Sequence, residues 1–324
     1  MKQFLFFCLT AMVCMSAQAQ TSPLRVGILT NGASDFWTAL QEAAQKEAEA
    51  QGVVLDFQIP SPATAEQQQL LALQMLNNGA KALALCPVKP KEQRDFLTEI
   101  SSKTALATLI TDAPGTGRRV FLGRDEKEVG TLFSTLLKTA IPEGLKVMAF
   151  CGKPDDKATK ARLEGLQEAL QDTFYLEGPK ADFGDRMLVA ANAADILQKR
   201  PEIACLIGLE NYQAPMLASA VTQSGRARIV RVIGFGQTAQ LLQQIEEGIV
   251  HGLVVDDGKG AAPVVLNALK ALAAGDPAFV IPKNECIYTP VTTVKTEKAL
   301  GAQEMIDALN TQVPWVPETA PGRP

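Results

Sequence analysis

The most constraining feature of this sequence is the alternation of short apolar runs with amphipathic stretches, which occurs in two successive rounds. The first round begins with RVGIL at 25–29 and ends with VFLG at 120–123. The second begins with KVMAF at 146–150 and ends with HGLVV at 251–255. Continuous apolar runs are typical of strands buried on both faces, as in parallel sheets covered by helices. The sequence therefore predicts two doubly wound α/β domains with parallel sheets.

The other elements of the two rounds follow from the same pattern. Further strands are expected at VVLDF (53–57), ALALC (82–86), ALATLI (105–110), IACLIGL (203–209) and RIVRVIGF (228–235). Helices are expected at 35–51, 66–77, after Pro90, at 158–170, at 186–198 and in a stretch ending at Ser224. No strand is expected between the helices at 158–170 and 186–198.

The first nineteen residues have the composition of a secretory signal. Lys2 precedes an apolar run over 4–15, and Ala17-Gln18-Ala19 is a small-x-small site, which predicts cleavage before Gln20. Lipid attachment at Cys14 is the alternative, although Val13 stands where a small residue would be wanted. We therefore expect an exported protein. Its formal net charge of −4, with no basic tract, argues against a nucleic acid as partner.

Nothing in the sequence indicates catalysis, a metal or a cofactor. Cys86, Cys151, Cys205 and Cys286 are widely spaced, and we expect single buried thiols on strands, with disulfides left open. The one histidine, His251, falls inside an expected strand with no candidate nucleophile near it in sequence, which favours a histidine of the core or strand edge. No G-x-S-x-G, H-E-x-x-H or Walker pattern occurs.

Polar and aromatic residues gather instead where the expected strands end. In doubly wound sheets ligands bind beyond the carboxyl ends of the strands, and two such edges can face one another across a cleft. Carboxylate, amide and guanidinium groups bond hydroxyls, and aromatic rings cover the apolar faces of a sugar, so this mixture suits polyols. The residues concerned are Asp112, Arg162, Glu210, Asn211, Asp256, Phe36, Trp37 and Phe235.

Phe36 and Trp37 stand side by side in the first turn of the expected helix at 35–51. Adjacent helical residues point about 100° apart, so one core stripe does not easily bury both rings. Packing of the pair and a ligand role both remain open, and we expect at least one ring to face the cleft.

The order of these segments resembles the periplasmic sugar-binding proteins of the ribose-binding type, which supply ABC transporters. The resemblance covers about residues 24 to 295, and no single motif is decisive. It is carried by RVGILTNGASDFWTALQEAAQKEAEAQG, AEQQQLLALQMLNNGAKALALCPVKP, TDAPGTGRRVFLGRDEKEVG, KATKARLEGLQEAL and IVRVIGFGQTAQLLQQIEEGIVHGLVV.

The resemblance implies a domain organisation and a mechanism. Residues 1–19 would be the signal peptide, 20–124 plus 257–287 the first lobe, and 125–256 plus 288–310 the second, joined by three crossover strands. Independently of the resemblance, the tail at 311–324 holds four prolines and cannot extend a helix, so it is either a strap over a domain or disordered. A monomeric periplasmic protein would close on a sugar or polyol and deliver it to an ABC permease. Signalling to a sensor kinase or chemoreceptor is the alternative, and a secreted enzyme on the same fold is the least favoured reading.

The resemblance also implies roles for individual residues. Phe36 and Trp37 match paired aromatics that flank the sugar, and Ser34 stands where an asparagine often bonds it. Arg162 matches a sugar-binding arginine, Phe235 the aromatic of a GFD turn, and Asp256 a polar hinge position. Phe183 matches a further stacking aromatic, unless a one-residue gap puts Gly184 there.

Departures from the family pattern narrow the range of expected ligands. Gly236 replaces a carboxylate that bonds two hydroxyls, and Glu210-Asn211 replaces an asparagine–aspartate pair. An aspartate–arginine pair corresponds to Asp112-Ala113 or to Ile110-Thr111, so its arginine is missing. These changes argue against a simple pentose such as ribose. The expected shell holds more acids than bases, which disfavours phosphorylated or acidic sugars, and we expect a neutral sugar, polyol or cyclic derivative.

Overall fold

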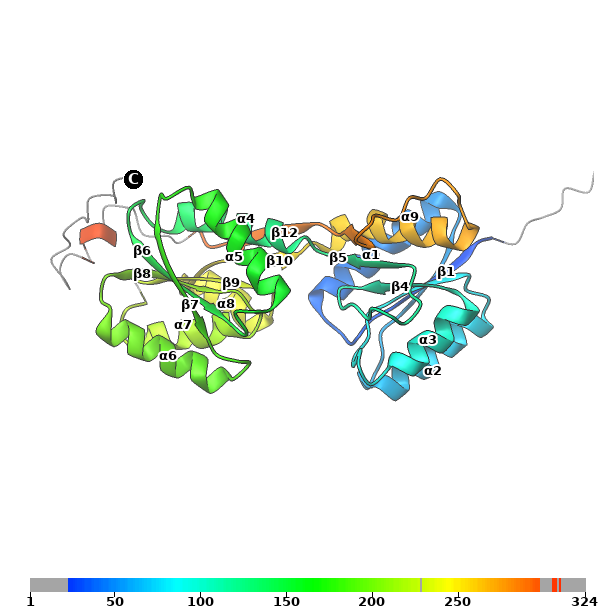
Figure 1. The fold of residues 1–324 in the computed structure, drawn as a ribbon, viewed down its shortest axis with the longest axis horizontal. Helices are drawn as coiled ribbons and strands as arrows, with labels where there is room; N and C mark the ends of the chain where they lie inside the picture. Colours follow the sequence, from blue (N-terminus) through cyan, green and yellow to red (C-terminus); the bar gives the residue numbers. More distant parts are fainter. Residues whose placement is uncertain (1–22, 228, 298–304, 308, 310–324) are drawn as a thin grey trace, which may run out of the picture.

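The computed structural model describes residues 23–227, 229–297, 305–307 and 309, and its chain forms two lobes that lie side by side along the long axis (Figure 1). Each lobe is built on one six-stranded sheet. The expected signal at 1–19 and tail at 311–324 lie outside the described residues, and the exact lobe boundaries stay a prediction.

The first lobe has the strand order β11-β5-β4-β3-β1-β2, with every neighbouring pair parallel. Helices α1 and α9 cover one face of this sheet, and α2 and α3 cover the other. Its elements are β1 Arg25–Leu29, α1 Asp35–Gln51, β2 Val54–Gln58, α2 Ala65–Asn77, β3 Ala82–Leu85, α3 Arg94–Lys103, β4 Ala105–Leu109, β5 Val120–Gly123, α9 Gly258–Ala274 and β11 Cys286–Tyr288.

The second lobe has the order β12-β10-β9-β8-β6-β7, in which only β12 is antiparallel to its neighbour. Helices α4 and α5 pack on one face, and α6, α7 and α8 on the other. Its elements are α4 Glu126–Ala140, β6 Lys146–Cys151, α5 Lys157–Leu170, β7 Tyr175–Ala181, α6 Arg186–Lys199, β8 Ile203–Gly208, α7 Gln213–Gln223, β9 Arg231–Phe235, α8 Ala239–Glu247, β10 Val250–Asp256 and β12 Val291–Lys295.

The predicted fold class is confirmed, because both lobes are α/β layers around parallel sheets. The expectation that no strand lies between α5 and α6 is wrong. There the segment YLEGPKA forms β7, the edge strand of its sheet. An edge strand has one exposed side and tolerates proline, so it lacks the apolar run that marks the central strands.

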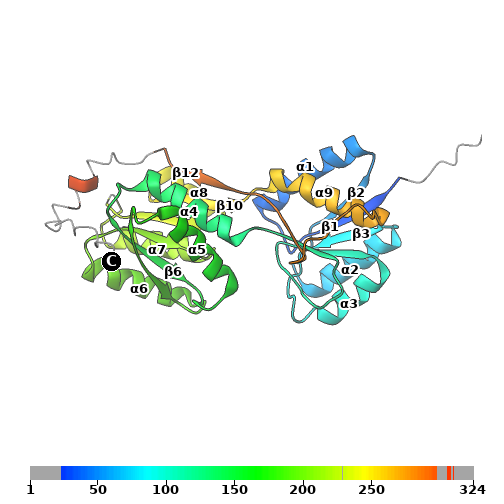
Figure 2. The same ribbon diagram turned by 45° about the horizontal axis from the view of Figure 1, so that its top comes forward.

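Three crossovers join the lobes, and the view in Figure 2 shows them as thin connections. They lie after β5, after β10 and between β11 and β12. Backbone hydrogen bonds tie them together: Thr289 N donates to Gly123 O (2.6 Å), and Asp257 N donates to Pro290 O (3.1 Å). The lobes are therefore connected by a three-stranded hinge.

Helices α4 and α5 approach closely because glycines stand at their contact. A Cβ atom on Gly165 would lie 2.0 Å from the carbonyl oxygen of Lys127, and one on Gly130 would lie 2.1 Å from that of Arg162. Real side chains do not tolerate such distances, so an alanine at either position would push the helices apart.

We expect Gly165→Ala to lower the free energy of unfolding by about 1–3 kcal/mol through overpacking. In an exposed helix, replacing glycine by alanine stabilises the protein by about 0.5–1 kcal/mol. The sign of the change in the free energy of unfolding therefore distinguishes a close contact from an exposed site. Urea unfolding of the wild type, of this variant and of Lys160→Ala, an exposed change on the same helix, measures the difference. A stabilised Gly165→Ala variant would disprove the close contact.

Several basic side chains are buried at the amino ends of the second sheet, among them Arg231 and His251. Arg231 begins β9 opposite Cys205 of β8, and its Nε and Nη2 atoms have no hydrogen-bond partner. His251 on β10 is 1% exposed, and its Nε2 lies 2.9 Å from the hydroxyl of Thr139. Burial, together with the charges of Arg231 and Lys295, lowers the pKa of His251 to about 4. The expectation of a core histidine on a strand is confirmed.

The four cysteines of the described chain are free thiols. Cys151 and Cys205 are buried on strands as expected, whereas Cys86 is buried one residue beyond β3 and Cys286 on β11 is only half-buried. Burial raises the pKa of the Cys86 and Cys151 thiols to about 11, which keeps both protonated at neutral pH.

Candidate functional site

A cleft of about 420 Å³ opens between the lobes, beside the hinge. The first lobe contributes the loops after β1 and β4, and the second contributes the loops after β8 and β9 and the start of α6. This is where the carboxyl ends of parallel strands place ligand loops. The lining residues are Asn31, Ser34, Phe36, Trp37, Ile110, Thr111, Arg124, Arg186, Asn211, Tyr212, Phe235, Gly236, Gln237, Thr238, Val255 and Asp256.

The two neighbouring aromatics of the first lobe have different environments. Their rings meet edge to face, with centroids 4.7 Å apart. Trp37 is 4% exposed and belongs to the core between α1 and the sheet, and its Nε1 donates to Asn31 Oδ1 (2.9 Å). Phe36 is only partly buried. Trp37 therefore packs mainly in the core while reaching the cleft wall, and Ser34 accepts from its backbone N–H (3.4 Å) to cap α1.

Phe235 forms part of the opposite wall, and two guanidinium groups contact its ring. Its ring centroid lies 4.9 Å from Cζ of Arg124 and 4.5 Å from Cζ of Arg162. Cation–π contacts of this kind are strongest where water is excluded, and Phe235 is buried. The two arginines thus fix the plane of the ring.

Arg162 is 3% exposed and is not among the residues that line the cleft. Its Nε donates to Glu126 Oε2 (2.7 Å), its Nη1 donates to the carbonyl oxygen of Leu209, and Glu210 Oε2 lies 3.7 Å from Nη1. Burial raises the pKa of the Glu210 carboxyl, and the charge of Arg162 opposes that rise. Arg162 and Glu210, both expected at the ligand, lie behind the wall that Phe235 forms.

Arg124 occupies the hinge side of the cleft and was not expected there. It follows β5, and its Nη1 lies 2.6 Å from each carboxylate oxygen of Asp256, at the end of β10. Its Nε donates to Glu126 Oε1 (3.2 Å), so Glu126 joins Arg124 to Arg162. The only sequence signal was the position of Arg124 at the approach to the expected hinge.

Asp112 does not line the cleft, contrary to expectation. Both of its carboxylate oxygens accept from Arg118, at 2.5 Å from Nε and 2.8 Å from Nη2. Arg118 also donates to Glu285 Oε2 (2.9 Å). The arginine that the family resemblance leaves missing beside Asp112 is thus supplied six residues later, and Asp112 lines a separate cavity of about 360 Å³.

Phe183, also expected at the ligand, is 68% exposed and lies outside the lining set. Its φ of +54° is uncommon for a bulky residue.

Asn211 and Asp256 line the cleft as expected, and Tyr212, Gln237 and Thr238 extend the polar wall. The side chain of Gln237 reaches the first lobe, where Nε2 donates to Asp35 Oδ2 (3.4 Å).

The charges of the lining differ from those expected. The lining contains two arginines, Arg124 and Arg186, and one carboxylate, that of Asp256, so bases outnumber acids among the lining residues. Behind the wall the two carboxylates of Glu126 and Glu210 outnumber the one cation of Arg162, so the lining and this layer together carry no net formal charge. In the described part of the chain, no group of three or more His, Cys, Asp and Glu residues is placed to hold a metal ion.

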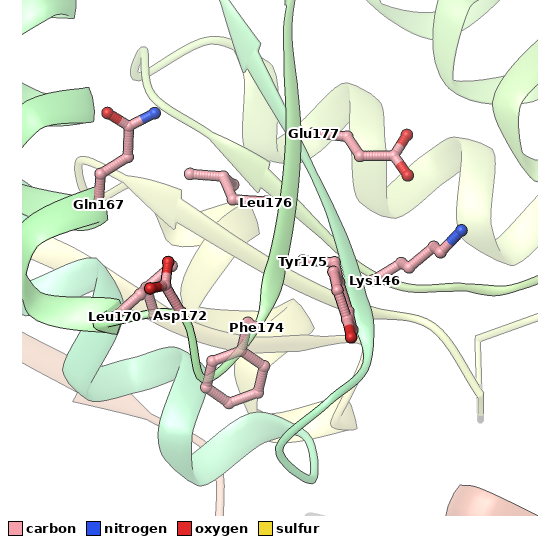
Figure 3. Close-up of a pocket in the computed structure, with 8 residues that line it drawn as sticks. All are labelled: Lys146, Gln167, Leu170, Asp172, Phe174, Tyr175, Leu176 and Glu177. Carbon is pink, nitrogen blue, oxygen red and sulfur yellow. The ribbon is translucent and has the colours of Figure 1, made fainter. Parts of the chain in front are cut away.

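A further cavity of about 450 Å³ lies along the edge strand β7 (Figure 3). Lys146 and Tyr175, the first residues of β6 and β7, both line it. It therefore lies at the amino ends of these strands, opposite the cleft. Figure 3 shows the ring of Phe174 and the side chains of Gln167 and Glu177 at separate points around it, without convergence on one centre.

Comparison with known proteins agrees with the architecture. Residues 26–277 match the model of the periplasmic binding protein domain family. The D-allose-binding periplasmic protein of Escherichia coli K12 is 23% identical over 245 residues, which cover 71% of this chain and 78% of that protein. The D-ribose/D-allose-binding protein of Pseudomonas aeruginosa is 23% identical over 294 residues, covering 86% and 90%.

Solved structures show the same fold. AraP, an arabinose-binding protein from Geobacillus stearothermophilus, superposes with a TM-score of 0.70 at 16% identity, covering 88% of this chain and 99% of AraP. The described residues contain no helix with the length and apolar character required to cross a membrane. The resemblance seen in the sequence is confirmed: the chain belongs to the periplasmic binding protein domain family and has its two-lobed type I fold.

Proposed function

We propose that this protein is a non-enzymatic solute receptor that captures a neutral sugar or polyol between its lobes and presents it to an ABC importer. One observation carries the proposal: both lobes and the hinge supply hydrogen-bonding side chains and aromatic rings to a single cleft. Ring faces cover the C–H faces of a sugar, and amides and carboxylates bond its hydroxyls. The names of the curated relatives, which specify D-allose and ribose, support the same ligand class.

Within this proposal, Phe36 and Phe235 lie on either side of the sugar, one from each lobe. Asn211 and Asp256 form hydrogen bonds with its hydroxyls. Ser34 lies at the same rim. Arg162 and Glu210 act from behind by fixing Phe235, and Asp112 and Phe183 contact the sugar only after the lobes rearrange. Closure about the three-stranded hinge then yields the form that the permease recognises.

The proposed location is the periplasm, reached through cleavage before Gln20. The family and the periplasmic relative from Escherichia coli support this location. Genes for a permease and an ATPase beside the gene for this chain would support import. A sensor kinase or chemoreceptor gene in that place would favour the signalling alternative, since both partners read the same lobe closure.

The direct test is thermal and urea unfolding of the mature protein with D-allose, D-ribose, D-arabinose, D-galactose, D-glucose, D-fucose and glycerol. A true ligand at about one hundred times its Kd should add about 2.7 kcal/mol to the free energy of unfolding. Glucose 6-phosphate and glucuronate are the charged controls, and mass spectrometry of the released sugar should recover it unchanged. If no neutral compound stabilises the protein, the proposed function is wrong.

A further inference from the structure

We propose that Arg124 is a ligand-contacting residue that determines specificity, and that with Asp256 it makes the hinge itself part of the binding site. This inference rests on the proposed function of the cleft as a sugar or polyol site. It assigns to Arg124 the sugar contact that the family resemblance implied for Arg162.

The first observation is that the Arg124 guanidinium is fixed on three sides. Nη1 lies 2.6 Å from both oxygens of Asp256, Nε donates to Glu126 (3.2 Å), and the ring of Phe235 lies 4.9 Å from Cζ. The side chains of Arg124 and Asp256 are only 15% and 19% exposed. A group held in this way loses little conformational entropy when a ligand binds.

The second observation concerns the remaining nitrogen. Nη2 of Arg124 donates to no acceptor in the described part of the chain, yet it is not one of the fully buried polar atoms that lack a partner. It is therefore open to solvent, and Arg124 lines the cleft. Nη2 is consequently the nitrogen of this cation whose two N–H groups are free to donate to a ligand in the cleft.

These donors lie beside an acceptor. Asp256 also lines the cleft, and each of its oxygens keeps a lone pair after accepting from Nη1. A hydroxyl group both donates and accepts, so a diol on the ligand can accept from Arg124 and donate to Asp256. Gly236 has no side chain with which to bond a hydroxyl on the neighbouring turn. The Arg124–Asp256 pair can bond ligand hydroxyls in its place.

The location on the hinge adds a mechanical consequence. Arg124 lies on the crossover after β5, and Asp256 lies at the crossover after β10. The Arg124–Asp256 pair itself joins these two crossovers, so a diol that bonds both side chains binds at the hinge itself. Such a ligand shifts the angle between the lobes by its differential affinity for the two states.

The test uses the full mature protein and the panel sugar that stabilises the wild type most. In Arg124→Lys, an ammonium can still pair with Asp256 but cannot also present the two Nη2 donors. Loss of a hydrogen bond from a charged donor should raise the Kd about 10- to 100-fold in isothermal titration. The matched control is Arg200→Lys, which changes an arginine paired with Glu177 outside the cleft and should leave the Kd unchanged.

A deoxy series separates ligand contact from mere support of the hinge. For the wild type, one monodeoxy form of the chosen sugar should bind about 10- to 100-fold more weakly than the parent. For Arg124→Lys, the same deoxy form should bind as well as the parent, because the contact is already lost. If Arg124 only supported the hinge, the deoxy form would bind more weakly than the parent sugar by the same factor in the variant as in the wild type. That result overturns the proposal.

The remaining outcomes are also decisive. If the wild type binds a panel sugar and Arg124→Lys binds it with the wild-type Kd, the inference is wrong while the proposed function stands. If the wild type binds none of them, both are wrong. If Arg124→Lys does not fold, the double variant Arg124→Gln/Asp256→Asn removes both charges of the pair, and an unchanged Kd there equally overturns the inference.

Discussion

Arg162→Ala should lower the free energy of unfolding by about 3–5 kcal/mol in the absence of any ligand. Arg162 is almost fully buried, and its removal leaves Glu126 and Glu210 without their shared cation. The carbonyl oxygen of Leu209 loses a donor, and the ring of Phe235 loses one of its two guanidinium contacts. Urea unfolding at pH 7 of the wild type and the variant measures the difference.

Lys127→Ala is the matched control for this prediction. Lys127 also joins two carboxylates, those of Glu164 and Glu168, but on the surface of α4 and α5. Exposed pairs of this kind contribute at most about 1 kcal/mol, so the control should unfold almost as the wild type does. An Arg162→Ala variant with wild-type stability and lost sugar binding would show instead that Arg162 acts at the ligand.

Between pH 7 and pH 4 the wild type should lose about 3 kcal/mol of stability through His251 alone. The pKa of His251 is lowered to about 4 by burial and by the charges of Arg231 and Lys295. In the unfolded chain the pKa returns to about 6.5, so the unfolded state binds a proton first as the pH falls. The stabilisation is complete above pH 6.5, declines between pH 6.5 and 4, and is absent below.

Comparison with His251→Gln isolates this contribution, because the carboxyl groups titrate alike in both proteins. The measured quantity is the free energy of unfolding across the pH range, and the two curves should converge toward acid pH. Arg231→Met removes a neighbouring cation and should make the decline in its own curve shallower. Parallel curves for the wild type and His251→Gln would contradict the lowered pKa.

The parts of the fold that the sequence predicted are those in which local chemistry and burial agree. The helix expected at 35–51 is α1 with the same bounds, because Ser34 caps its start and Gly52 adopts the left-handed conformation at its end. The strand β3 is fully buried and consists only of alanine and leucine. By contrast, β7 carries Glu177, Gly178 and Pro179 and pairs on one side only, so its apolar signal is weak.

The candidate site was predictable as a set of loops but not as a set of contacts. Strand order places the loops of Phe36, Asn211 and Phe235 at the cleft. Which charged side chain faces the ligand depends on its partner, and Arg124 and Asp256 are 132 positions apart in the chain. The direction of Arg162, inward toward Glu126, is likewise set by the packing of α4 on α5.

The last strands of the described residues, β11 and β12, also determine when the two sheets can be completed. β11 pairs with β5, and β12 pairs with β10, so residues 286–295 complete an edge of each sheet. During synthesis neither sheet can be completed before residues 286–295 are made, and a pairing as distant in sequence as that of β5 with β11 forms slowly. A chain cut before Cys286 would leave the edges of β5 and β10 open to wrong partners. The nascent protein thus cannot complete either sheet until residues 286–295 are made, which suits the proposed export as an extended chain.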